Sequence, residues 1–311
     1  MSRYDQDQQR AALVASTDTI RYEQPVLADV PPLTFEVPDG RFVPRVDPEH
    51  PFYHHQHEPF NIARYRFCAP PIEIGASRLD YTVLPAVLTN VLRLPIKFPG
   101  TEYRLPVEIA PFADLIERVA RYESGFNARH RECFVHVTID DSEVLPGEYH
   151  RYPGFHGDGV QGAKFSQREY TPIEHSYVFV SEPPTEFCLQ PFFVEHLNDA
   201  RHNLFHEFER QIREANIVGT LPWHVYLIDP YMIHRTPPIL VGCRRIFFRI
   251  TFCYTELQHP KNTQNPHFPE SGVYAARWDV RNFLTTYPGQ IPWEMYGLSS
   301  GPVIDSPPEP R

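Results

Sequence analysis

The sequence has few of the features that mark secreted, membrane-spanning or nucleotide-binding proteins. Its five cysteines among 311 residues are scattered, odd in number and never spaced Cys-x-x-Cys. That pattern predicts buried, reduced thiols of a cytosolic protein and not a disulfide framework. The first fifteen residues lack the apolar core of an export signal, and the most apolar segment, residues 83–96, is too short to span a bilayer. We therefore expect a soluble, cytoplasmic protein with no membrane partner.

An excess of cationic residues is also lacking. The chain has 29 Lys and Arg against 39 Asp and Glu, a formal net charge of −10. This balance argues against a nucleic-acid backbone or an anionic membrane as the main partner. No internal repeat and no glycine-rich phosphate loop are present. These absences leave a small molecule as the expected partner.

Proline and aromatic residues, in contrast, are plentiful. The 34 prolines fit many short strands and irregular connections better than a helix bundle, and 14% aromatic residues fit a folded chain. Helical spacing of apolar residues occurs at 111–121, at 200–215 and, over a shorter stretch, at 278–284. Strand-like patterns occur at 134–139, 175–180, 185–192, 224–228, 232–234 and 245–255. Many short strands with one inserted helix favour an antiparallel sandwich or barrel over a βαβ array.

Three histidines lie together in residues 52–57, and the cluster has two interpretations. His54, His55 and His57 have imidazoles that metals prefer, but Glu58 is the only nearby carboxylate and no cysteine lies at ligand spacing. Neighbouring histidines in one loop rarely converge on one ion. We therefore expect a solvated loop or the rim of a substrate pocket.

A second group of candidate metal ligands is His156 and Asp158, with His234 far downstream. On a strand, the residue between the first two would let both side chains leave the same face. Two neutral imidazoles and one carboxylate are the ligand set of the 2-His-1-carboxylate facial triad, which binds Fe(II) and leaves positions open. Each residue alone also has an ordinary explanation, since Asp158-Gly159 is typical of a turn and a single histidine often caps or braces a strand.

The residues after His234 carry a resemblance to a known family. Pro238, Gly242 and the basic run Arg244-Arg245-Ile246-Phe247-Phe248-Arg249 follow it, and this arrangement resembles the Fe(II)/2-oxoglutarate-dependent dioxygenase superfamily. The likeness covers roughly residues 133–255 and is specific at these motifs. It implies a mainly β fold with flanking helices, namely a double-stranded β-helix (a cupin-like jelly roll). It also implies that His156, Asp158 and His234 are the catalytic metal ligands, with Fe(II), 2-oxoglutarate and O2 as cofactor and cosubstrates.

The resemblance further implies how the chain is organised. We expect a single oxygenase domain over residues 1–311, with an N-terminal arm at 1–50, a jelly-roll core at about 133–255 and a C-terminal extension at 256–311. The sequence gives no indication of the oligomeric state.

The arginine that would anchor 2-oxoglutarate has three candidates. A buried C5 carboxylate needs a guanidinium held in fixed geometry. The spacing to Arg244 is similar to that of prolyl hydroxylases, whereas the run as a whole resembles taurine dioxygenase, with the anchor at Arg245 and a second pocket arginine at Arg249. We expect Arg245 first and Arg249 second; the alternative for each is an ordinary ion pair with Asp or Glu.

The activity that the resemblance implies is decarboxylation of 2-oxoglutarate to succinate and CO2, coupled to hydroxylation, desaturation or cyclisation of a substrate. Related halogenases have a small residue at the carboxylate position, so Asp158 disfavours halogenation. We expect a small polar metabolite such as an amino acid or a natural-product intermediate as substrate. The alternatives are a cupin-like metalloenzyme that does not use 2-oxoglutarate and a non-catalytic jelly-roll binding protein. The candidate substrate residues are Arg151, Tyr152, Gln161 and Lys164.

Overall fold

The computed structural model describes residues 31–37, 49–79, 84, 90–151, 154–160, 162, 165, 173–198, 200–257 and 262–268. Three of the candidate substrate residues, Tyr152, Gln161 and Lys164, lie outside the described residues. The same holds for the helix expected at 278–284 and for most of the expected N-terminal arm.

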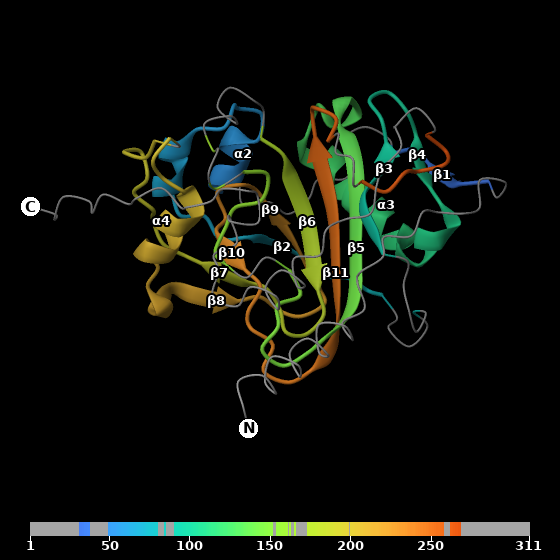
Figure 1. Ribbon diagram of the computed structural model, residues 1–311. Coiled ribbons are helices and arrows are strands. Elements are labelled where there is room, and N and C mark those ends of the chain that lie inside the picture. Colours follow the sequence, from blue (N-terminus) through green and yellow to red (C-terminus); the bar gives the residue numbers. More distant parts are fainter. Residues whose placement is uncertain are drawn as a thin grey trace, which may run out of the picture.

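A six-stranded antiparallel sheet forms the centre of the fold (Figure 1). Its strand order is β2 (Ile72–Ala76), β9 (His224–Ile228), β6 (His175–Val180), β11 (Cys243–Cys253), β5 (Phe134–Val144) and β3 (Val91–Lys97). The two long strands β5 and β11 pair over eleven residues each, without a register shift. Side chains of β11 therefore alternate strictly between the two faces of this sheet.

A smaller three-stranded sheet lies beside the large one. It consists of β10 (His234–Arg235), β7 (Glu186–Cys188) and β8 (Ile217–Gly219), and an isolated bridge joins His156 to His234 at its edge. In Figure 1 it lies between the main sheet and helix α4 (Leu204–Gln211). A separate pair, β1 (Leu33–Phe35) and β4 (Tyr103–Leu105), lies beyond β3. The expectation of a mainly β fold with flanking helices is confirmed, and the jelly roll stays a prediction.

Helix α3 (Ala113–Phe126) covers one face of the main sheet. Leu115, Ile116, Val119 and Ala120 recur at helical spacing and are buried against strand residues in the largest hydrophobic cluster. Burying each of the larger side chains contributes about 1.5–3 kcal/mol. The helix predicted at 111–121 is confirmed, with bounds of 113–126, and Pro111 belongs to a preceding 3₁₀ helix, η2 (Val107–Phe112).

Helix α4 packs in a second hydrophobic cluster with Leu204, Phe205 and Phe208. Asn203 caps its N-terminus, accepting hydrogen bonds from the backbone N–H groups of Phe205 and His206. The expected helix over 200–215 is shorter than predicted because the cap fixes its start. The remaining helices are α2 (Pro51–His55), η1 (Ile62–Arg66), η3 (His130–Glu132) and η5 (Glu214–Asn216).

The histidine cluster at 52–57 is not a solvated loop, so that expectation was wrong. Residues 51–55 form α2, and the His55 side chain is buried with its Nε2 2.8 Å from Asp229 Oδ2. His57 Nδ1 lies 2.8 Å from the Tyr254 hydroxyl oxygen. The rings of His55 and His57 thus have partners from different parts of the fold, which the local sequence does not reveal, whereas His54 is exposed.

The edges of the main sheet are irregular or covered. Strand β2 has a register shift at Glu73/Gly75, and β3 has two shifts and contains Pro95. Residues 262–268 lie along β3. The Thr263 N–H donates to the Leu92 carbonyl at 2.7 Å, the Leu92 N–H donates to the Thr263 hydroxyl at 2.9 Å, and the Asn265 amide donates to the Pro95 carbonyl at 2.7 Å. The extended end of the described chain thus closes one edge of the sheet.

The cysteines are all free, with no disulfide among the described residues. Cys133, Cys188 and Cys253 are buried as expected, Cys243 is partly buried and Cys68 is exposed, which contradicts the prediction at that position. No helix within the described ranges is both long and apolar enough to cross a membrane.

Candidate metal centre

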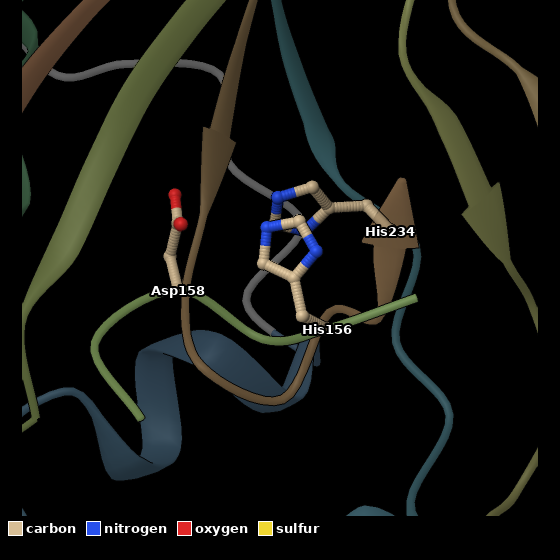
Figure 2. A group of neighbouring side chains, drawn as sticks. All are labelled: His156, Asp158 and His234. Atoms are coloured by element: carbon tan, nitrogen blue, oxygen red, sulfur yellow. The ribbon is translucent and has the colours of Figure 1, made fainter. Parts of the chain in front are cut away.

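The structure brings His156, Asp158 and His234 together at one point. Their candidate ligand atoms all lie within 4.8 Å of one another, and the two imidazole rings have centroids 4.6 Å apart. Figure 2 shows the two rings side by side, with the Asp158 carboxylate turned toward the same space. Two imidazole nitrogens and one carboxylate oxygen at this separation form a donor set suited to a divalent transition metal.

Backbone pairing holds the two histidine segments against each other. The His156 N–H donates to the His234 carbonyl at 2.9 Å, and the His234 N–H donates to the His156 carbonyl at 3.0 Å. Gly157 allows this approach because a Cβ at that position would lie 2.0 Å from the Pro230 carbonyl oxygen. Asp158 lies in a turn and not on a strand. The expectation that His156 and Asp158 leave the same face of one strand was therefore wrong.

The tautomer of each histidine is set by a backbone carbonyl. His156 Nδ1 lies 2.8 Å from the Gly154 oxygen, and His234 Nδ1 lies 2.9 Å from the Met232 oxygen. A carbonyl can only accept, so Nδ1 carries the hydrogen in both rings, and Nε2 is the nitrogen with the lone pair when the ring is neutral. Burial, followed by the neighbouring His234, lowers the pKa of His156 to about 3, so this ring is neutral at physiological pH.

Asp158 is held by an arginine of the main sheet. Arg249 Nη1 donates to Asp158 Oδ2 at 2.9 Å. Burial alone would raise the pKa of Asp158, but the Arg249 charge outweighs it, and the pKa lies below its ordinary value. The carboxylate therefore remains ionised, as a metal ligand must be.

A cavity between the two sheets contains this centre. Its walls come from β6, β9 and β11 on one side and from β7 and β10 on the other. Apolar and aromatic side chains share the lining with charged and polar ones, a mixture that suits the binding and orientation of a small molecule. The lining residues are Arg151, His156, Asp158, Val178, Phe179, Val180, Thr185, Phe187, Thr220, His224, Tyr226, Ile228, His234, Thr236, Phe247 and Arg249.

The three candidate anchor arginines have different partners. Arg244 makes a two-pronged ion pair with Asp141, at 2.8 and 2.7 Å, and does not line the cavity. Arg249 lines the cavity and pairs with Asp158. The ordinary ion pair that was the alternative for each arginine is therefore present at Arg244 and at Arg249.

Arg245 is the arginine of this run that has no carboxylate partner among the described residues. Its side chain is fully buried; Nε donates to the Pro183 carbonyl at 2.9 Å and Nη1 donates to His150 Nδ1 at 3.0 Å. Its Nη2 has no hydrogen-bond partner within the described part of the chain. Burial lowers the pKa of Arg245 to about 10, so the guanidinium is still charged at neutral pH. It does not line the cavity, although it shares a face of β11 with Phe247 and Arg249, which do.

Of the candidate substrate residues, Arg151 is described and lines the cavity. Sequence reasoning did not find the residues that support it, which are Asp140 and His150. A buried aspartate on β5 and a histidine in the loop after it carry no local signal of this role, since only the return of the loop brings the two side chains together.

Comparisons with known proteins give distant likenesses. No protein-family model and no curated protein matches the chain. The structure of EvdO2 from Micromonospora carbonacea var. aurantiaca complexed with 2-oxoglutarate is similar with a TM-score of 0.33 and 12% identity, covering 56% of this chain and 71% of EvdO2. AviO1 from Streptomyces viridochromogenes Tue57 has a TM-score of 0.33 and 12% identity, covering 64% of this chain and 96% of AviO1. HygX from Streptomyces hygroscopicus with nickel and 2-oxoglutarate bound has a TM-score of 0.28 and 12% identity, covering 65% of this chain and 84% of HygX. Likenesses this low assign no family.

Proposed function

We propose that the protein is an Fe(II)/2-oxoglutarate-dependent dioxygenase that hydroxylates, desaturates or cyclises a small polar metabolite. The observation that carries the proposal is the convergence of the candidate ligand atoms of His156, Asp158 and His234 within 4.8 Å at the wall of a cavity. Two antiparallel sheets that face each other across this cavity also support a jelly-roll fold.

The donor set fits Fe(II) in both chemistry and charge. His156 and His234 would bind the ion through Nε2, because Nδ1 of each donates to the backbone. Asp158 would bind through the oxygen that Arg249 leaves available. When bound, iron and 2-oxoglutarate supply the oxidising chemistry. The protein's own residues hold the ligands in place, exclude water and orient the substrate.

Arg245 is the residue we assign to the C5 carboxylate of 2-oxoglutarate. Arg244 and Arg249 already have a carboxylate each, whereas Arg245 is a buried cation whose Nη2 has no described partner. A buried charge without a counter-ion is costly, and a dicarboxylate would remove that cost. Arg245 shares a face of β11 with Phe247 and Arg249, which line the cavity, so it lies on the side of the strand from which the carboxylate would approach.

An anaerobic titration with Fe(II) and 2-oxoglutarate tests the metal site. We expect a weak visible charge-transfer band that requires both ligands and that disappears in His156→Ala. His202→Ala is the matched control, because its ring lies on the surface beside Asn198 and lines no part of the cavity. A band of wild-type intensity in His156→Ala would contradict the assignment of the ligands.

The assignment of Arg245 is tested by 2-oxoglutarate affinity. Arg245→Gln should raise the dissociation constant about 10- to 100-fold, since a charge-assisted hydrogen bond contributes about 1.5–3 kcal/mol. Arg244→Gln should leave it unchanged, because that arginine is paired outside the cavity. An unchanged affinity in Arg245→Gln together with a loss in Arg249→Gln would move the anchor to Arg249.

The same titration separates the two other functions that the sequence leaves open. A cupin-like metalloenzyme would bind the metal with no effect of 2-oxoglutarate, and a binding protein without a metal centre would show neither signal. Screening metabolites for succinate release would then identify the substrate.

A further inference from the structure

Arg151 is the second cation that lines the cavity, and its position is fixed from two sides. Its guanidinium carbon lies 4.5 Å from the centre of the Phe247 ring, a cation–π contact, and its Nη1 donates to Asp140 Oδ2 at 3.0 Å. The side chain is 14% exposed, so one part of it remains accessible from the cavity while the rest is buried.

Asp140 is itself held by several donors. It is 1% exposed and accepts hydrogen bonds from His150 Nε2 and from the Ser142 hydroxyl, both at 3.0 Å. His150 is buried, and burial lowers its pKa to about 4, so it is neutral. A neutral His150 accepts from Arg245 at Nδ1 and donates to Asp140 at Nε2. One hydrogen-bonded chain therefore runs from Arg245 through His150 and Asp140 to Arg151.

Among the described residues that lie at or next to the cavity, arginines outnumber carboxylates. Three arginines, Arg151, Arg245 and Arg249, stand against two carboxylates, Asp140 and Asp158. His150 and His156 are neutral, and His224 at the cavity wall is paired with Glu73. Among the described residues, Arg151 and Arg249 are the two arginines that line the cavity, and Arg249 is paired with the candidate ligand Asp158.

We infer that Arg151 forms a subsite for an anionic group of the substrate, a carboxylate, sulfate or phosphate. This inference rests on the proposed function and narrows its substrate class from a polar metabolite to an anionic one. A guanidinium that is already fixed by Asp140 and Phe247 loses little conformational freedom when it binds an oxyanion, so affinity is gained at low entropic cost.

Inorganic sulfate is a suitable probe, measured as binding of radiolabelled sulfate by equilibrium dialysis at constant ionic strength. Arg151→Gln should weaken sulfate binding about tenfold, and Arg151→Lys should restore part of it, since lysine keeps the charge but not the fork of donors. The matched control is Arg129→Gln, another arginine that lies over an aromatic ring (Tyr254, 4.6 Å) and pairs with a carboxylate (Glu132), but far from the cavity lining. Thermal unfolding of each variant shows that it is folded.

Two further measurements separate the possible sources of the signal. Arg151→Gln should leave 2-oxoglutarate affinity unchanged, while Arg245→Gln should reduce it. If Arg151→Gln reduces 2-oxoglutarate affinity as strongly as Arg245→Gln does, Arg151 binds the cosubstrate and the inference is overturned. It is also overturned if sulfate binding survives in Arg151→Gln and is lost in Arg245→Gln.

The subsite and the proposed function fail in different ways. If sulfate binding depends on Arg151 but the protein shows no charge-transfer band with Fe(II) and 2-oxoglutarate, the proposed oxygenase function is contradicted and the anion site is supported. If the charge-transfer band is present but sulfate binding is the same in Arg151→Gln as in the wild-type protein, the oxygenase function is supported and the subsite is contradicted. Metabolites can then be compared by the rate of succinate release that they stimulate. Anionic compounds should give higher rates than their neutral amides, and this difference should disappear in Arg151→Gln.

Discussion

At the residue scale, backbone carbonyls determine which nitrogen of each candidate ligand can bind a metal. Gly154 and Met232 each lie two residues before a ligand histidine, and each accepts from the Nδ1 of that histidine. These backbone contacts fix the tautomer of both candidate donors. Asp158 is held by another side chain, that of Arg249.

This dependence predicts the effect of removing Arg249. In Arg249→Gln the Asp158 carboxylate loses its charged partner and becomes free to rotate, so the metal dissociation constant should rise about tenfold, as is usual when a residue that orients a metal ligand is lost. Competition between the protein and a chromophoric chelator for Mn(II) measures the change. Arg244→Gln serves as the control, because its partner Asp141 is not a candidate ligand. Equal metal affinity in the two variants would show that Arg249 does not position Asp158.

The three arginines of β11 also show which part of the site the sequence can predict. The basic run after His234 is enough to indicate a site for an anion, but not which arginine serves it. That choice depends on which carboxylates the fold brings near each guanidinium. Asp141 reaches Arg244 through the pairing of β5 with β11, and Asp158 reaches Arg249 from the turn that follows His156. Both contacts join residues about a hundred positions apart, where no local pattern operates.

At the scale of elements, the periodic segments were predicted well and the irregular ones poorly. Strand β6 has the predicted bounds, and β5 and β11 were found but are longer or differently bounded than their patterns indicate. The alternation of apolar residues fades toward the ends of β5 and β11, whereas backbone pairing continues over eleven residues. The extent of these strands is thus decided by the partner strand and not by the segment itself.

The contact between residues 154–160, which carry His156 and Asp158, and the loop before β10 has no sequence signal other than Gly157. Gly157→Ala would place a methyl group against the Pro230 carbonyl and force the segments apart, so we expect a loss of about 1–3 kcal/mol in the free energy of unfolding. Metal affinity should fall as well, because His156 and His234 are paired across this contact.

Thermal or denaturant unfolding measures the stability of Gly157→Ala. Gly219→Ala is the matched control, since a Cβ there meets nothing within 4 Å and the backbone does not require glycine. If both variants are equally stable and bind metal equally, the close contact between Gly157 and the Pro230 carbonyl does not determine the geometry of the candidate metal centre.

At the scale of the whole molecule, buried neutral histidines link stability to pH. His136 lies on β5 at 3% exposure, and burial, followed by the charge of Arg93, lowers its pKa to about 3. In the unfolded chain its pKa returns to about 6.5. The unfolded state therefore binds more protons than the folded state between these values, and stability falls as the pH drops from about 6.5 toward 3.

His136→Leu should remove this contribution. Between pH 7 and pH 5 the wild-type protein should lose about 1–2 kcal/mol more of its unfolding free energy than the variant, because the slope approaches about 1.4 kcal/mol per pH unit for one proton. Urea unfolding at a series of pH values measures the difference. Only the slopes are compared, so a constant offset from the substitution does not matter; parallel curves would show that His136 does not govern this range.

The irregular borders of the six-stranded sheet have a consequence for how molecules of this protein meet. A long, straight outermost strand would offer its unpaired amides to a neighbouring molecule and invite fibrous association. Here one border is kinked at β2, and the other carries Pro95 and is occupied by residues 262–268. Removing the latter segment should therefore expose unpaired backbone groups of β3 and make the protein prone to self-assembly at a strand that does not carry the candidate metal ligands.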